Sequence, residues 1–348
     1  MEIAIEYEYG KYLEFEGENL TYIFGANHEI KWKLYRGLKR FCTGKNLSEL
    51  EENVYGDDGI VIKCDERHMK AKDLPMYFLD CRESFLEQYR YTKGSMMQKF
   101  IDSLENDFQL TKHLEMLNDD FLKMEIGMQN NFASTLTHVY PVIKSITYKE
   151  MVKHFLELSF SERDIVFPID MMDITMLIDD YCTLLRTEIE KTQKKTWLWI
   201  NNPNAFISKR VFSLFLKKLK KISEDTNLLH VFIMSDDYLD LHYQAEDISN
   251  TILVYETYQQ LPHFHVLADS IGNYYPNDFS YSSENLITSL YRIFPYIGWD
   301  SSSGEVYLKS KDMILLKVVA QLLPCHMKIK CTDLGEKLTS LELKFLLS

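Results

Sequence analysis

The sequence is poor in the features that mark secreted and membrane proteins. Its 348 residues include six cysteines, and no two of them have the C-x-x-C spacing of metal and redox sites. Scattered single cysteines predict reduced thiols, and hence a cytoplasmic protein. The most apolar stretch, Met313 to Leu323, is interrupted by Lys317 and is too short to span a bilayer. The first eight residues carry acids where an export signal needs basic residues, so we expect neither export nor a membrane partner.

Positive charge is scarce overall but concentrated locally. The formal net charge is −13, from 39 basic and 52 acidic residues, which on average disfavours a polyanionic partner. Two segments, Ile30 to Lys45 and Lys191 to Ser223, contain no acid and hold 15 of the 39 basic residues. The rest of the chain therefore has 24 basic and 52 acidic residues, a net charge of −28. An acidic body with a concentrated basic surface suits a protein that binds a polyanion at one place and repels it elsewhere.

Both acid-free segments contain a predicted helix with a basic, solvent-facing side. In the helix predicted over Ser208 to Ile222, an apolar stripe opposes a face with Arg210, Lys217 and Lys221. Such lysines often only keep a helix soluble, and this alternative stays open beside DNA contact. The aromatic residues fall on core stripes rather than between basic residues, which favours duplex over single-stranded DNA. The candidate DNA-binding residues are Lys33, Arg36, Lys39, Arg40, Lys194, Lys195, Lys209, Arg210, Lys217, Lys218 and Lys221.

A loop of the phosphate-binding type lacks residues that it needs. It follows a strand predicted over Leu20 to Phe24 and precedes a predicted helix that starts at Lys31. The working pattern is G-x-x-x-x-G-K-S/T, and Gly25 and Lys31 stand in its register. Ile30 replaces the second glycine, where a β-branched residue would strain a turn that needs positive φ. Trp32 replaces the hydroxyl residue that would bind Mg²⁺.

The second nucleotide motif lacks its acids. In ABC-type ATPases an apolar strand ends in Asp-Glu-Pro, whose Asp serves Mg²⁺ and whose Glu polarises the attacking water. Here the strand that begins at Thr196 ends in Asn201, Asn202 and Pro203, and amides supply neither a negative charge nor a base. The Leu-Ser-Gly-Gly-Gln type signature expected before the second strand is also missing. We therefore predict that the protein is not an enzyme; the alternative is a divergent ABC/SMC-like ATPase acting on DNA.

The changes of periodicity along the chain predict an α/β protein of three domains. Residues 1–81 and 192–260 form a discontinuous head, like a degenerate P-loop or ABC-ATPase domain with a mostly parallel sheet. Residues 82–191 form a long helical insertion, the leg domain. Residues 261–348 form a smaller mixed α/β domain. Its predicted elements are helices near Glu284 to Ile293 and Lys311 to Leu323 and a strand at Met327 to Cys331.

Two apolar stripes in the leg domain have helical spacing. The first consists of Leu114, Leu117, Phe121, Met124 and Met128, and the second of Ile174, Leu177, Tyr181 and Leu185. Packing inside the leg domain is the favoured interpretation, and contact between subunits is the alternative.

No metal site stands out in the sequence. The acids Asp236, Asp237 and Asp240 resemble nuclease ligands only superficially, because adjacent acids on a helix point apart. His263 and His265 have the spacing of one face of a strand, yet no nearby residue completes a zinc site. We interpret them as two histidines on a half-buried strand and leave the metal unassigned.

The chain resembles a known family. The segment Trp197 to Phe206, the helix after it, the strand at His230 and the segment Ile146 to Phe155 resemble the toroidal DNA-binding adaptation protein of type II CRISPR systems. Usual members end near the equivalent of residue 260, so this chain is similar to a long variant with an extra C-terminal domain.

The resemblance implies a function without catalysis. It implies an ATPase-like head without ATPase activity, a helical leg and a homotetrameric ring. It further implies that the ring binds ends of linear double-stranded DNA in a basic central channel and takes part in acquiring new spacers. The implied partners are other CRISPR adaptation proteins and the RNA-guided nuclease, and no cofactor is required. Short members bind Ca²⁺ through an acid-rich stretch, but the corresponding stretch here, Thr137 to Lys144, has no carboxylate.

Overall fold

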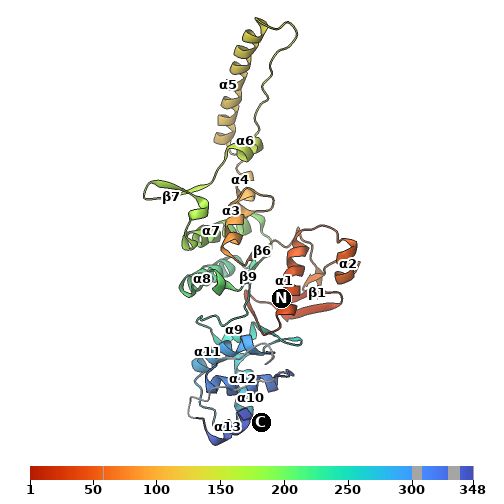
Figure 1. Ribbon diagram of the computed structural model, residues 1–348, viewed down its shortest axis with the longest axis vertical. Helices are drawn as coiled ribbons and strands as arrows, with labels where there is room; N and C mark the ends of the chain where they lie inside the picture. Colours follow the sequence, from red (N-terminus) through yellow and green to blue (C-terminus); the bar gives the residue numbers. More distant parts are fainter. Residues whose placement is uncertain (58, 300–307, 328–337, 348) are drawn as a thin grey trace. The chain divides into compact units, whose positions relative to one another are not determined.

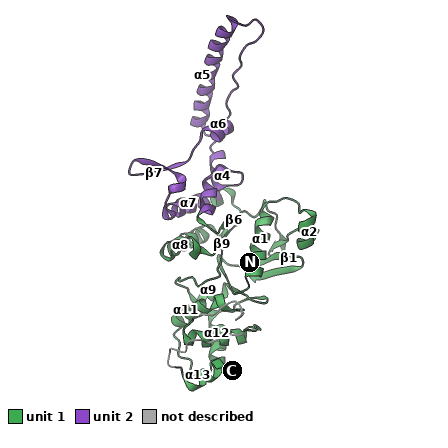
Figure 2. Cartoon of the chain, in the orientation of Figure 1, with its two compact units in different colours: residues 1–82, 189–348 green, residues 83–188 purple. Residues whose placement is uncertain are grey.

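The computed structural model describes residues 1–57, 59–299, 308–327 and 338–347 (Figure 1). They form two compact units, one of residues 1–82 and 189–348 and one of residues 83–188 (Figure 2). The residues after 260, which we expected to form a domain of their own, are grouped with the head in the first unit. No helix in the described part of the chain is long and apolar enough to cross a membrane.

The first unit is built on a six-stranded sheet. Its strands are β3 (Leu20–Phe24), β6 (Met76–Leu79), β9 (Thr196–Asn201), β10 (Leu229–Met234), β11 (Thr251–Val254) and β12 (Tyr258–Gln260). They lie in the order β12-β11-β3-β10-β9-β6, and only β12 runs antiparallel to its neighbour. Every residue of β3, β10 and β11 is buried, as in parallel sheets that are covered on both faces. The expected α/β class with a mostly parallel sheet is therefore confirmed.

One face of this sheet is covered by a second sheet and a helix, and a further short helix packs on the second sheet. These elements are β1 (Glu2–Glu8), β2 (Lys11–Glu16), β4 (Ile62–Cys64), β5 (Arg67–His68), α1 (His28–Cys42) and α2 (Glu49–Tyr55). The second sheet is antiparallel, in the order β2-β1-β4-β5. Trp199 and Phe232 of the large sheet share one core with Ile3 of β1 and Leu34 of α1. The rings of Trp199 and Phe232 stack with their centroids 4.3 Å apart.

The opposite face of the large sheet is covered by α8 (Lys209–Thr226), α9 (Ala245–Ser249) and α11 (Ser283–Ile293). Side chains alternate along a strand, so Tyr22 and Phe24 of β3 point away from Ile23 and the α1 core. Their rings contact Tyr291 of α11 at centroid distances of 5.7 and 5.9 Å. Helix α8 packs on β10, so α1 and α8 lie on opposite faces of the sheet (Figure 1).

The described residues after 260 are mostly helical. Besides α11 they form α10 (Phe264–Tyr274), η3 (Phe294–Tyr296), α12 (Ser310–Leu322) and α13 (Ser340–Leu347). The two helices predicted here are confirmed as α11 and α12. The prediction that His263 and His265 lie on a half-buried strand is wrong, because His263 is the N-cap of α10 and His265 lies in that helix. The strand predicted from Met327 to Cys331 lies outside the described residues beyond Met327 itself.

The second unit is mainly helical. Its elements are α3 (Arg82–Tyr89), α4 (Met96–Asp102), α5 (Phe108–Ala133), α6 (Tyr148–Phe155), β7 (Ser159–Glu162), β8 (Ile165–Pro168), η1 (Ile169–Met171) and most of α7 (Ile174–Thr192). Helix α7 fully buries Leu177, Tyr181 and Leu185 of its predicted stripe, and Ile174 at its start is half-buried. Helix α5 buries none of its 26 residues, and Leu117 and Met124 remain 40% and 57% exposed. Packing inside the leg therefore explains the stripe of α7 and Leu114 of α5, which packs against Ile101, Tyr148 and Val152. It does not explain the other end of the α5 stripe, where Leu117, Met124 and Met128 are exposed.

Candidate nucleic-acid interface

The loop between β3 and α1 is shorter than a phosphate-binding loop. Gly25 has φ +113°, and a Cβ atom there would lie 2.0 Å from the carbonyl oxygen of Val254, so only glycine fits. Helix α1 already begins at His28, and its N-cap, Asn27, accepts a hydrogen bond from the backbone N–H of Ile30 at 3.0 Å. Ile30 therefore lies in the first helical turn and not among the positive-φ residues. The strain that we expected at Ile30 does not arise.

Backbone N–H groups that would hold a phosphate in a working loop are bonded to protein oxygens here. Ala26 donates to the carbonyl oxygen of Ile297 at 2.8 Å, and Asn27 donates to that of Val254 at 3.3 Å. Lys31 donates its backbone N–H to Asn27 at 3.3 Å. The Asn27 side chain also donates to the carbonyl oxygen of Tyr255 at 2.5 Å. Main-chain atoms of residues 254–255 and 297 thus surround the loop and use its donors.

The lysine of the motif is buried in an ion pair. Lys31 is 3% exposed, and its Nζ donates to the carboxylate of Asp236, directly after β10, and to the carbonyl oxygen of Ser235 at 3.3 Å. Burial lowers the pKa of Lys31, and the charge of Asp236 opposes that shift. Burial raises the pKa of Asp236, but the charge of Lys31 and hydrogen bonds from Lys31 and Asn202 outweigh it, so the pKa of Asp236 is lowered overall.

Asn202 completes this cluster from the end of β9. Its side-chain nitrogen donates to Asp236 at 2.8 Å, and its side-chain oxygen accepts the backbone N–H of Asp236 at 2.8 Å. The structure thus joins Gly25, Lys31 and Asn202 around one loop, while Asn201 only ends the strand and Trp32 points to solvent at 56% exposure. The role of Asp236 was missed in the sequence, because only the fold brings it to Lys31. Among the described residues, no cluster of three or more His, Cys, Asp or Glu side chains is placed to hold a metal.

Most candidate cations of α1 are already paired with acids from other elements. Lys33 contacts Glu29 at 2.7 Å and Glu8 at 3.4 Å, and Lys39 contacts Asp80 at 2.7 Å. These ion pairs neutralise a face that the sequence presents as purely basic.

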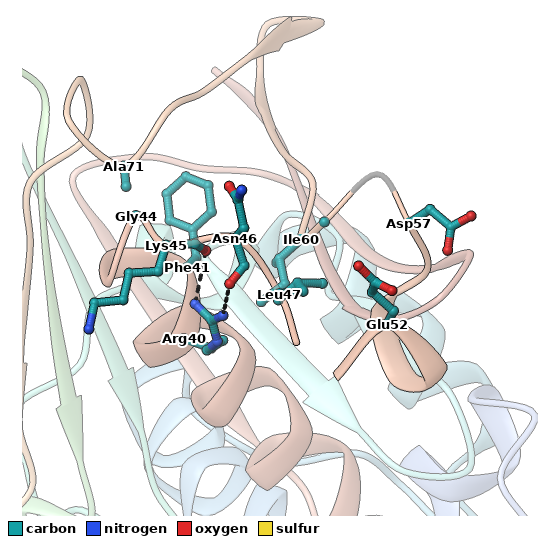
Figure 3. Close-up of a pocket in the computed structure, with 11 residues that line it drawn as sticks. Arg40, Phe41, Gly44, Lys45, Asn46, Leu47, Glu52, Asp57, Ile60 and Ala71 are labelled. Carbon is teal, nitrogen blue, oxygen red and sulfur yellow. Dashed lines mark hydrogen bonds between the residues drawn. The ribbon is translucent and has the colours of Figure 1, made fainter. Parts of the chain in front are cut away.

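Arg40 is part of the protein's own framework. Its guanidinium donates to the Glu51 carboxylate at 3.0 Å and to the carbonyl oxygens of Lys45 and Asn46 at 3.1 and 2.7 Å. Figure 3 shows it in the wall of a hollow of about 480 Å³, with the two carbonyl contacts drawn as dashed lines. The pKa of Glu51 is lowered to about 2, chiefly by the hydrogen bond from Arg40 and also by those from Ser48. Arg40 therefore has no free donor group directed at a ligand.

The outward face of α8 keeps its charge. Arg210, Lys217 and Lys221 are exposed, and no carboxylate of the described residues pairs with them. They share one side of the helix because they are 7 and 4 residues apart, and the opposite side buries Phe212 and Phe215, as predicted.

The remaining candidates lie around this face. Lys209 is paired with Asp240, and Lys218 is exposed. Lys194 donates to the carbonyl oxygen of Lys72 at 2.8 Å, and Lys195 lies 3.9 Å from Asp65. Of the eleven candidates, most of those on α1 are therefore neutralised, whereas Arg210, Lys217 and Lys221 on α8 pair with no carboxylate of the described residues.

Comparisons with known proteins identify the family of this fold. A search of curated proteins finds no match. The crystal structure of Stu0660 of Streptococcus thermophilus superimposes with a TM-score of 0.82 at 19% identity, over 99% of this chain and 100% of that one. The ABC-transporter component cbiO1 from Clostridium perfringens gives a TM-score of 0.35 at 12% identity, over 68% of this chain and 80% of that one. The SMC head bound to the C-winged helix domain of ScpA gives a TM-score of 0.40 at 8% identity, over 76% of this chain and 98% of that one.

The sequence match extends over almost the whole chain. Residues 5–346 match the family described as CRISPR-associated protein Csn2, subfamily St. The resemblance to the adaptation proteins of type II CRISPR systems is confirmed by this match and by the shared fold. The chain therefore belongs to the Csn2 family of CRISPR-associated proteins, subfamily St.

Proposed function

We propose that this protein binds the ends of linear double-stranded DNA in the cytoplasm and acts in the acquisition of new spacers without catalysing a reaction. The observation that carries the proposal is the exposed face of α8, where Arg210, Lys217 and Lys221 have no carboxylate partner among the described residues. Phosphate contacts need charge and reach rather than a sequence motif, so three spaced cations suit sequence-tolerant binding of a duplex. The other partners, namely CRISPR adaptation proteins and the RNA-guided nuclease, follow from the family alone.

Helix α5 supports the homotetrameric ring that the proposal includes. Its residues Leu110, Leu117, Met124 and Met128 form one line along the helix and are 39% to 57% exposed. The chain segment Pro141–Ile146 covers only the neighbouring side, where Glu125 accepts the backbone N–H of Ile143 at 2.6 Å. An apolar line of this length on a 26-residue helix requires a partner surface. We assign that surface to a second copy of this chain.

The loop between β3 and α1, whose N–H groups are bonded to protein oxygens, supports the absence of ATP hydrolysis. We propose that the head is a degenerate ATPase domain, because Val254 and Ile297 use loop donors and Asp236 neutralises Lys31. No cofactor is part of the proposal, and Ca²⁺ binding remains an expectation from the family that Thr137 to Lys144 does not support with a carboxylate.

A closed ring must be threaded onto DNA from a free end, whereas an open groove can bind a duplex from the side. We expect linear duplex to bind, covalently closed circular duplex of the same sequence not to bind, and linearised circle to bind again, because the acidic outer surface repels a duplex laid along it. The double variant L117E/M124E should lower the oligomeric mass in solution and abolish this discrimination. The control M116E/I126E adds the same charge to the other side of α5 and should keep both the mass and the discrimination. Equal retention of circles and linear fragments by the unaltered protein would eliminate the closed ring.

The competing function is a divergent ABC/SMC-like ATPase acting on DNA. Calorimetry with ATP and Mg²⁺ separates the two, since we expect no binding and no turnover. Micromolar binding, with turnover that Lys31→Ala abolishes, would establish the ATPase instead. Because Lys31→Ala also removes a buried ion pair, the thermal midpoint of the variant serves as the folding control.

A further inference from the structure

Trp32 stands apart from the core aromatics. It lies at the hydroxyl position of the phosphate-loop pattern and is 56% exposed, whereas Trp197 and Trp199 are fully buried. More than half of the indole surface of Trp32 is therefore open to solvent and available to a ligand. Our expectation that aromatic residues lie only on core stripes is wrong at this position, because Trp32 is interleaved with Lys33 and Arg36 on the exposed side of α1.

The inner face of Trp32 is supported by a fixed cation. The guanidinium carbon of Arg36 lies 4.5 Å from the centre of the Trp32 ring and 5.5 Å from the centre of the Tyr55 ring. Its Nε donates to the hydroxyl of Tyr55 at 3.1 Å. The three side chains form a stack that holds the indole in place before any ligand arrives, which lowers the entropic cost of binding.

Arg36 brings positive charge that the local acids do not cancel. Lys33 is paired with Glu8 and Glu29, and Lys11 shares Glu8. No carboxylate of the described residues pairs with Arg36, whose terminal nitrogens remain beside the indole. The stack therefore combines an open aromatic face with a cation suited to a phosphate.

We propose that Trp32 is a stacking platform for an unpaired nucleobase of a DNA strand, with Arg36 contacting the adjacent phosphate. Every nucleobase has a flat face that stacks on an aromatic side chain, so the platform is tolerant of sequence. A protein partner fits less well, because protein-binding hot spots lie within a water-excluding surround, whereas the charged residues Glu29 and Lys33 neighbour Trp32. The site lies on the opposite face of the sheet from α8, so it goes beyond the duplex-binding function and does not depend on it.

Binding of a fluorescently labelled single-stranded oligodeoxythymidine tests the site. Trp32→Ala should weaken binding by about 5- to 150-fold, the range that a lost base stack produces. Trp32→Phe should retain most of the affinity, because it keeps an aromatic face. Arg36→Gln should make the fall of log K with log salt less steep by about 0.7, the value for one phosphate contact of a single strand. Tyr274→Ala, which removes an aromatic ring that is 57% exposed in α10, should change nothing.

The platform would be excluded if Trp32→Ala bound the oligodeoxythymidine as tightly as the unaltered protein. A changed oligomeric mass with unchanged oligodeoxythymidine binding would also overturn the proposal and make Trp32 a protein contact. Near-ultraviolet circular dichroism of the buried Trp197 and Trp199 reports whether each variant is folded. A blunt-ended duplex has neither an overhang nor a loop and so carries no unpaired nucleotide, and its binding should depend on α8 and not on Trp32. Failure of the α8 surface and failure of the platform are therefore separate results.

Discussion

Helices α1 and α8 carry the two acid-free, basic segments of the chain, and they differ in what surrounds them. On α1, Lys33, Lys39 and Arg40 face carboxylates from β1, the end of β6 and α2. On α8, Arg210, Lys217 and Lys221 face solvent. Absence of acids in a segment therefore does not mean absence of acids around it. Which of the two segments can attract a polyanion depends on the fold: within the part of the chain that the structure describes, α8 has three cations without a carboxylate partner, whereas α1 has Arg36 alone.

The largest expected effect comes from reversing the charges on α8. Each phosphate contact contributes about 0.9 to the slope with which log K falls as log salt rises. One contact therefore raises the binding constant at 0.1 M salt by roughly tenfold relative to 1 M salt. The triple variant R210E/K217E/K221E should therefore lose several hundred-fold in affinity for all duplexes alike, with a salt slope lower by about three. Fluorescence anisotropy of a labelled linear duplex at several salt concentrations measures both quantities.

The matched control makes the same change of net charge in the other acid-free segment, at two lysines of α1 and at Lys45 shortly after the helix. The triple variant K33E/K39E/K45E should bind the duplex with nearly unchanged affinity, because the first two of these lysines are already paired. Equal losses of duplex affinity in the two triple variants would contradict this difference and would mean that both helices contact DNA.

A smaller effect, on stability, is expected at the buried lysine of α1. Asp236→Ala leaves the charge of Lys31 buried without its partner, which should lower the free energy of unfolding by about 3 kcal/mol, the lower end for such pairs because Asp236 is 35% exposed. Lys31→Met removes the buried charge itself, so it should lower the free energy of unfolding by less than Asp236→Ala does. Lys217→Met on α8 should change stability by no more than about 0.5 kcal/mol. Urea denaturation checks all three, and a larger loss for Lys31→Met than for Asp236→Ala would contradict the ion-pair account.

The contrast between α1 and α8 also marks how far the sequence could lead. Patterns of apolar residues sufficed for β3, β9, β10 and the buried side of α8, because each depends on residues adjacent in the chain. The pairing of Lys39 with Asp80 and of Lys31 with Asp236 joins residues 41 and 205 positions apart, so no local pattern contains it.

The stripes of α5 and α7 make the same point for apolar residues. Both have helical spacing, yet Leu177 is fully buried and Leu117 is 40% exposed. Periodicity predicts which side of a helix is apolar but does not identify the surface that covers it. The same limit explains why the exposed position of Trp32 was not predicted.

The smallest expected effect is a change in pH dependence at the Arg40–Glu51 pair. The pKa of Glu51 is lowered from 4.5 to about 2 by the hydrogen bonds from Arg40 and Ser48. A depressed carboxylate pKa gives stability that is fully present above pH 4.5 and is lost as the pH falls through 2. Glu51→Gln should therefore flatten the fall of the thermal midpoint between pH 4.5 and 2, whereas Glu224→Gln, at an exposed position of α8, should leave it unchanged. An equally steep fall in Glu51→Gln would mean that Arg40 is not held by this carboxylate, and α1 would then offer Arg40 in addition to Arg36 as a cation for DNA.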